Sequence, residues 1–286
     1  MDQSFTPIIG LKEYGPAVPY FAHMEPWFIP GNSHTKATGI VYDSRDPATI
    51  SRQLAAIKAM GFSGVNINYY GPHYADLETA SHNILVGCAS LGLSCFLCPD
   101  KGMYNWDAKP NWQSHMIAAM NWIKQLYISS PIAFKLDGKP VLNFFIDPTD
   151  DPYLNWDKIR AVTPDAIFLF ENSGGYKRPQ SNGAYAWVNG AFDGTDIGLS
   201  YLNSFYSAPV PAGKYRFGAF WPGFNDQLAG WHPATGPRVI PRNDGLTLLQ
   251  TLGLANGKTP LHGLICSTWN DHEEGSAIEF GVAQYN

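Results

Sequence analysis

Short apolar segments alternate with longer amphipathic segments along most of this 286-residue chain. A short apolar run bounded by turn residues is typical of a buried strand, and apolar residues that recur every three or four positions are typical of a helix. The pattern predicts strands at residues 18–24, 64–68, 93–97, 140–145, 166–170, 184–188, 216–221 and 263–268.

Helices are predicted between these strands. The first is capped by Asp46, has Pro47 at its first position and is stopped by Gly61. Further helices are predicted at residues 75–91, 112–128, 154–162 and 243–255, with a weak helix or an irregular turn near residues 197–206.

Strand and helix alternate eight times, which is the pattern of an α/β protein with a (β/α)8 TIM barrel. An open doubly wound sheet is the alternative. It is disfavoured because no glycine-rich phosphate loop follows the first strand and because eight strands overfill such a sheet. Proline and glycine are spread evenly, and neither a linker nor a domain-sized repeat is present. We therefore predict a single barrel domain over residues 1–286.

Polar and aromatic residues gather just after the predicted strands. In a parallel barrel the loops that follow the strands meet at one rim, and barrel enzymes place their active sites there. The segments before the strands carry mainly glycine, proline and small turn residues. The sequence thus predicts a cleft at one rim, and the residues expected to contact a substrate in it are Glu25, Trp27, Asn68, Tyr70, Asp100, Glu171, Trp221, Trp269 and His272.

The stretch after the last predicted strand carries the densest charge in the chain. Residues 263–268 are followed by Trp269 and Asn270, and then by Asp271, His272, Glu273 and Glu274. Carboxylates crowded beside an aromatic surface have pKa values that are pushed apart, so that one holds a proton while another is charged. This pattern indicates an acid/base site. The alternative is a structural loop neutralised by Lys101, Lys177 or Arg178.

Composition narrows the possible ligands. Aromatic residues make up 14% of the chain, with nine Trp and fifteen Tyr. Flat rings stack on the apolar faces of pyranose sugars, which favours a sugar-binding cleft about as much as an aromatic-rich core. The formal net charge of −5, without any basic block, argues against nucleic acid or an anionic membrane as a partner. No apolar run is long enough to predict a transmembrane helix.

Residues 269–279 read W-N-D-x-x-E-G-x-x-I-E, which resembles the WN(D/E)xxEG signature of glycoside hydrolase families 71 and 99. Two further segments agree: Asp43–Pro47 before the first helix, and Pro222–Asp226 after the seventh strand. Members of these families are endo-acting α-glucanases and α-mannosidases. The resemblance implies a barrel glycoside hydrolase that cleaves an α-linked poly- or oligosaccharide and needs no cofactor.

The resemblance also implies roles for two carboxyl groups. Asp271 is the base, acting on water or on a substrate hydroxyl, and Glu274 is the acid that protonates the departing sugar oxygen. The families contain inverting and retaining branches, and residue identity does not decide between them. The α-glucanase branch has an additional Asp where Asn68 aligns, and an amide cannot act as a base. Glu273 becomes the acid if the alignment slips by one residue.

Other functions stay open at this stage. One is a barrel glycosidase that acts on a β-linked or furanoside polymer, and another is a carbohydrate-binding relative without catalysis. A metal site formed by His23, Glu25, Asp100 and Asp271 is disfavoured because no paired-His spacing accompanies these residues. We expect a monomer that binds no metal.

The cysteines and the N-terminal segment give less information about function. The four cysteines, Cys88, Cys95, Cys98 and Cys266, are expected to be buried free thiols, because residues three apart on a strand face opposite sides. The N-terminal MDQSFTPIIG lacks the basic-then-apolar pattern of a signal peptide. Either the protein is intracellular or a leader has been removed, and in the second case a secreted or periplasmic location is favoured.

Overall fold

The structure is a computed structural model that describes residues 10–280. The two ends of the predicted domain, residues 1–9 and 281–286, lie outside the described part, and so does most of the N-terminal segment discussed above. The extent of a single domain over the whole chain therefore stays a prediction.

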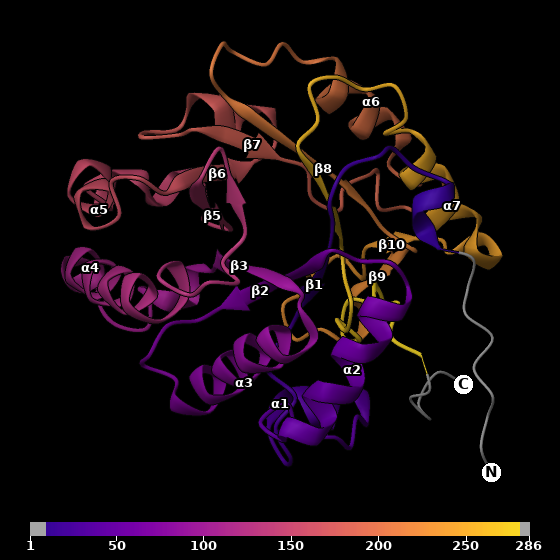
Figure 1. The fold of residues 1–286 in the computed structure, drawn as a ribbon. Helices are drawn as coiled ribbons and strands as arrows, with labels where there is room; N and C mark the ends of the chain where they lie inside the picture. Colours follow the sequence, from indigo (N-terminus) through magenta and orange to yellow (C-terminus); the bar gives the residue numbers. More distant parts are fainter. Residues whose placement is uncertain (1–9, 281–286) are drawn as a thin grey trace.

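Eight parallel strands close into a barrel, with the helices around its outside (Figure 1). In order around the barrel the strands are β3 (Ser94–Pro99), β2 (Gly64–Tyr69), β1 (Tyr20–Met24), β11 (Gly263–Cys266), β8 (Tyr215–Phe220), β7 (Gly183–Tyr185), β6 (Ile167–Glu171) and β5 (Lys139–Phe144). The barrel closes where β3 pairs with β5, with Leu97 opposite Leu142. This closure confirms the (β/α)8 fold and excludes the open sheet.

The helices on the outside follow the predicted order. They are α2 (Pro47–Ala59), α3 (Ala75–Leu91), α4 (Trp112–Ile123), α5 (Trp156–Val162), α6 (Leu199–Ser207) and α7 (Leu246–Gly253). Asp46 caps α2 as expected, because its carboxylate accepts the backbone N–H groups of Ala48 and Thr49, both at 3.1 Å. The predicted helix at residues 112–128 is interrupted, since its last turn, Lys124–Ile128, is a π-helix.

Some short elements were not predicted. They are α1 (Ser33–Thr38), β4 (Lys135–Leu136) and the hairpin of β9 (Phe224–Asn225) with β10 (Val239–Ile240). Each is too short for a hydrophobic period to be recognised. Of the predicted strands, β7 differs most, since it ends at Tyr185 rather than at residue 188.

Alternation along the strands divides the barrel interior into layers. Successive side chains of a strand point to opposite faces, so Phe21, His23 and Glu25 all point inward from β1 and its end. The lower interior is filled by packed rings, such as Phe21 and Phe96 at 4.8 Å between centroids. His23, two residues after Phe21, is buried and hydrogen-bonded to Asn66, which is hydrogen-bonded in turn to Asn143. An apolar plug therefore supports a polar layer, and the site lies above that layer.

Candidate active site

A cavity of about 790 Å³ opens at the carboxyl ends of the strands. It is lined by eight of the predicted site residues: Glu25, Trp27, Asn68, Tyr70, Asp100, Glu171, Asp271 and Glu274. Other lining residues were not among the predicted catalytic or substrate-contacting residues, and they include His23, His34, Trp187, Trp231 and Arg238.

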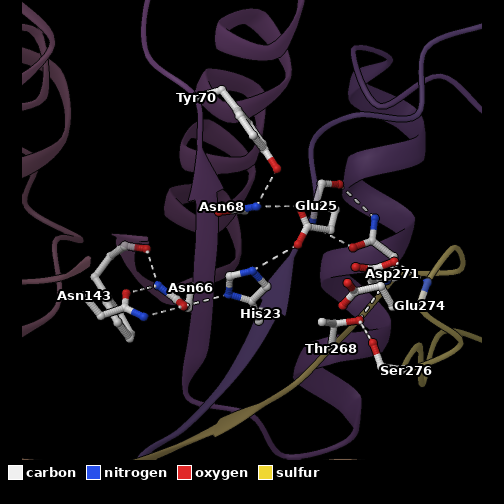
Figure 2. Close-up of polar contacts among 12 residues, drawn as sticks. His23, Glu25, Asn66, Asn68, Tyr70, Asn143, Thr268, Asp271, Glu274 and Ser276 are labelled. Atoms are coloured by element: carbon white, nitrogen blue, oxygen red, sulfur yellow. Dashed lines mark hydrogen bonds and ion pairs between the residues drawn. The ribbon is translucent and has the colours of Figure 1, made fainter. Parts of the chain in front are cut away.

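The loop after β11 holds Asp271 and Glu274 in a tight turn (Figure 2). The backbone N–H of Asp271 donates to Thr268 Oγ1 at 2.8 Å, and the backbone N–H of Glu274 donates to Asp271 Oδ1 at 2.9 Å. Gly275 then has φ +57°, in the left-handed region that glycine enters without strain. The spacing of three residues thus places both carboxyl groups on the same cavity.

Both carboxyl groups bind their protons more tightly than usual. Burial, followed by repulsion from Glu274 and Glu25, raises the pKa of Asp271 well above its ordinary value. Burial raises the pKa of Glu274 to about 7, although the Trp231 N–H and Arg238 act in the opposite direction. Two carboxylates this close ionise together only at a cost, so the pair tends to keep one proton at neutral pH.

Glu274 is contacted by two side chains from the connection between β9 and β10. Trp231 Nε1 donates to Glu274 Oε1 at 2.8 Å, and an Arg238 guanidinium nitrogen lies 3.8 Å from the same oxygen. Arg238 is fixed in turn by Asp226, which is fully buried and accepts the Arg238 Nε–H at 2.7 Å. The cation beside Glu274 is therefore Arg238, and Arg242 donates to the Gly275 and Ala277 carbonyls of the same loop, both at 2.9 Å. Asp226 belongs to the segment after β8 that carries the family resemblance.

Glu25 lies at the end of a buried hydrogen-bond chain (Figure 2). His23 Nδ1 is 2.8 Å from Asn66 Oδ1, and His23 Nε2 is 3.1 Å from Glu25 Oε1. The Asn68 amide donates to Glu25 Oε2 at 2.9 Å and to the Tyr70 hydroxyl at 2.7 Å. Both carboxylate oxygens of Glu25 are thus held in place on the cavity surface.

Two further acids line the cavity. Burial raises the pKa of Asp100 to about 6, although its carboxylate accepts the Gly102 N–H at 2.7 Å. Burial also raises the pKa of Glu171, which accepts a hydrogen bond from the Asn172 amide at 2.8 Å. Asp100 follows the last residue of β3 and Glu171 is the last residue of β6, and both continue the inward-facing alternation of their strands. Their place at the strand ends is the signal by which the sequence predicted them.

Three predicted contact residues do not line the cavity. Trp221 is fully buried, and its Nε1 donates to the Ile197 carbonyl at 3.0 Å. Trp269 is also buried, and its ring packs against Phe280 at 6.2 Å. His272 contacts Glu279 Oε2 at 3.0 Å. These side chains pack into the protein, so the cavity lining gives no support to the sugar contact predicted for them.

Glu273 and Glu274 are adjacent in the chain but lie in different surroundings. Glu274 lines the cavity, whereas Glu273 is buried against His34, with 2.5 Å between Glu273 Oε2 and His34 Nδ1. The register that assigns the acid to Glu274 therefore agrees with the position of the cavity better than the register shifted by one residue.

Other features within residues 10–280 bear on the remaining predictions. All four cysteines are free and buried, as expected. No group of three or more His, Cys, Asp or Glu side chains in this range is arranged to hold a metal ion. The helices of the described part are not long and apolar enough to cross a membrane.

No family model matches the chain, and no curated protein matches it by sequence. Solved structures do. The chain superimposes on two structures of the GH99 endo-alpha-mannosidase from Bacteroides thetaiotaomicron, at 15% identity, with TM-scores of 0.68 and 0.66. These alignments cover 91% of this chain and 86% and 87% of the mannosidase chains. A structure titled glycoside hydrolase-like protein aligns with a TM-score of 0.61 at 10% identity, over 97% of this chain and 90% of the other. The chain thus shares the barrel fold of these structures, and this is the fold that its sequence resemblance implied.

Proposed function

We propose that this protein is a glycoside hydrolase that cleaves an α-linked poly- or oligosaccharide, with Asp271 and Glu274 as its base and acid. The observation that carries the proposal is that both carboxyl groups line one open cavity, three residues apart on the loop after the last strand. Their raised pKa values allow the pair to hold one proton at neutral pH.

The surroundings of Glu274 fit a general acid. Its Oε1 accepts the Trp231 N–H at 2.8 Å, which fixes the carboxyl group and leaves the second oxygen to carry the proton. In the proposed reaction this proton passes to the glycosidic oxygen as the C–O bond breaks. Asp271 takes a proton from the attacking group, which is water or a neighbouring hydroxyl of the substrate. After this step Asp271 holds a proton and Glu274 is charged, so the pair must return to its starting protonation state before the next turnover.

The substrate class rests on the structural neighbours and on the cavity. The GH99 structures are titled endo-alpha-mannosidase, which favours an α-linked glycan. We propose that hydroxyl groups of this glycan bind the remaining cavity residues from the prediction: Glu25, Trp27, Asn68, Tyr70, Asp100 and Glu171. Because Asn68 donates to Glu25 and Tyr70, it is a binding and positioning group in this proposal and not a second base.

The experiment is a screen of reducing-sugar release from α-1,3-glucan, α-mannan and arabinan, with product anomers followed by NMR. Asp271→Asn and Glu274→Gln should each lower kcat/KM at least about a hundredfold, as loss of a positioned acid or base does. Asp157→Asn is the control, because Asp157 is exposed, contacts Gln180 and does not line the cavity. Unchanged turnover in both cavity variants would refute the pair.

Two alternatives give different results in the same screen. A barrel glycosidase with another specificity would leave the α-glycans intact and release sugar from arabinan, the furanoside polymer of the screen, or from a β-linked glucan added to it. A carbohydrate-binding relative would retain a polysaccharide on a column and release no reducing sugar from any substrate. No specific contact in the cavity favours either alternative over the α-glycosidase.

A further inference from the structure

Three rings lie together on one side of the cavity. Trp27 and His34 are stacked, with 4.5 Å between centroids and 4° between planes. Trp231 lies 5.8 Å from Trp27 and 6.3 Å from His34, tilted against both. All three line the cavity. The first two come from the end of β1 and from α1, and the third comes from the β9–β10 connection, so two segments far apart in the sequence form this aromatic wall.

A contact with Glu274 fixes Trp231, and with it the position of the aromatic wall. Trp231 donates its indole N–H to Glu274 at 2.8 Å, yet the residue is 46% exposed. The edge of the ring is thus fixed on the carboxyl group while much of the ring is open to a ligand. A general acid faces the oxygen of the leaving group. A ring fixed on that acid therefore lies beside the leaving part of the substrate.

Glu273 supports the wall from inside the protein. Its side chain is 3% exposed, and it contacts the ring of His34, which is 24% exposed, at 2.5 Å. A buried carboxylate needs a hydrogen-bonding partner, and here the Nδ1–H of His34 donates to it. The contact sets the plane of the imidazole, and that plane is parallel to the Trp27 indole.

We propose that the exposed face of Trp231, backed by the Trp27–His34 stack, binds the sugar unit that leaves, and that Glu273 is a positioning residue that holds His34. This inference rests on the proposed function and adds a subsite and a role for the second acid of the Glu273–Glu274 pair. Stacking of a sugar on an indole face explains why the ring stays exposed beside the acid.

The test compares two substrates of the wild-type enzyme. One is the α-glucan or α-mannan oligosaccharide that it cleaves, and the other is the glycosyl fluoride of the same sugar, which lacks the leaving sugar. Fluoride also departs without a proton from Glu274. Loss of the subsite should therefore raise KM for the oligosaccharide and leave the fluoride rate and the pH profile unchanged.

His34→Ala and Glu273→Ala are expected to raise KM for the oligosaccharide about three- to tenfold, the size of one aromatic contact. Because Glu273 acts through His34, the double variant should be no worse than His34→Ala alone. Glu273→Gln, which can still accept the imidazole N–H, should retain most of the affinity. If Glu273→Ala does not fold, the partly exposed His34→Ala carries the test.

His73→Ala is the matched control, since His73 is stacked on Trp106 at 3.8 Å but does not line the cavity. Equal losses on both substrates, additive effects of the two substitutions, or no effect would each overturn the subsite. A wild-type protein inactive on every oligosaccharide and fluoride would instead refute the proposed function itself, so the two failures are distinguishable.

Discussion

The side-chain amide of Asn270 exchanges two hydrogen bonds with the main chain of Glu25. Asn270 Oδ1 accepts the Glu25 N–H at 2.7 Å, and Asn270 Nδ2 donates to the Glu25 carbonyl at 2.9 Å. One residue earlier, the Trp269 N–H donates to the His23 carbonyl at 2.6 Å. The contacts between β1 and β11 thus continue past the strand ends, and they fix Glu25 next to the acidic loop.

Asn270→Ala should weaken both the fold and the site. It leaves the buried N–H and C=O of Glu25 without partners, which costs about 1–3 kcal/mol for each unpaired group. Because the acidic loop loses its anchor, we also expect kcat/KM to fall about tenfold or more. Urea unfolding and steady-state kinetics measure the two effects. Asn256→Ala, which removes a bond to the Tyr14 carbonyl near the surface, should change neither by a comparable amount.

His23→Ala should be among the most damaging substitutions in the polar layer. His23 joins Asn66 to Glu25, and its removal leaves the buried Glu25 Oε1 without its partner. Leaving a buried polar group without its hydrogen-bond partner costs about 1–3 kcal/mol, and more when that group is charged. Thermal unfolding should show the loss, and His23→Gln should recover part of it. A variant as stable as wild type would show that Glu25 does not depend on this contact.

The pH profile of kcat/KM should reflect the raised pKa values of the pair. The active state holds one proton on Asp271 and Glu274, so activity is lost on acidification when the second carboxyl group protonates. Burial raises the pKa of Asp271, the proposed base, well above its ordinary value, so the acidic limb should lie above the usual carboxyl range. Glu274→Gln, assayed on a glycosyl fluoride, should leave this limb near its wild-type position, because Glu274 in the active state is protonated and is therefore as neutral as the amide that replaces it. A limb near pH 4 in the wild type would contradict this prediction.

The contribution of Glu274 to stability should fall as pH rises, because burial raises its folded-state pKa. A carboxyl group with a raised folded-state pKa binds its proton more tightly in the folded than in the unfolded state, so stability is lost as pH rises from about 4.5 through the folded pKa. For Glu274 that interval extends to about 7. Glu274→Gln removes the ionisation, and its stability relative to wild type should rise by about 1–3 kcal/mol between pH 5 and pH 8. Urea unfolding at the two pH values measures the difference, and a relative stability that falls would refute the sign.

Glu279 should be a structural residue, although it belongs to the acidic motif. Its carboxylate accepts hydrogen bonds from the Tyr42 hydroxyl at 2.9 Å and from the Gln53 amide at 2.7 Å, and it also contacts His272. Glu279→Ala removes these buried hydrogen bonds, so we expect a clear drop in unfolding free energy, by about 2–4 kcal/mol. Glu279→Gln should lose less. Kinetics on the folded fraction should show a smaller change than for Glu274→Gln.

Much of the fold could be predicted because strands and helices leave local periodic patterns. The residues that end or follow the predicted strands included Glu25, Asp100 and Glu171, and the structure places all three on the cavity. The same criterion did not identify cavity residues correctly in every case. Trp221 follows β8 directly and Trp269 lies three residues after the end of β11, but strand alternation does not fix which way a ring points once the strand has ended, and both rings are buried outside the cavity.

The sequence by itself determined the barrel, the rim at which polar residues gather, and the candidate pair Asp271 and Glu274, because each depends on residues close together in the chain. Only the tertiary structure decided the neighbours of that pair. Trp231 and Arg238 reach Glu274 from the β9–β10 connection, and His34 reaches Glu273 across 239 positions of sequence. Such contacts form between loops whose conformations follow from packing and from groups such as the buried Asp226, and no local pattern encodes them.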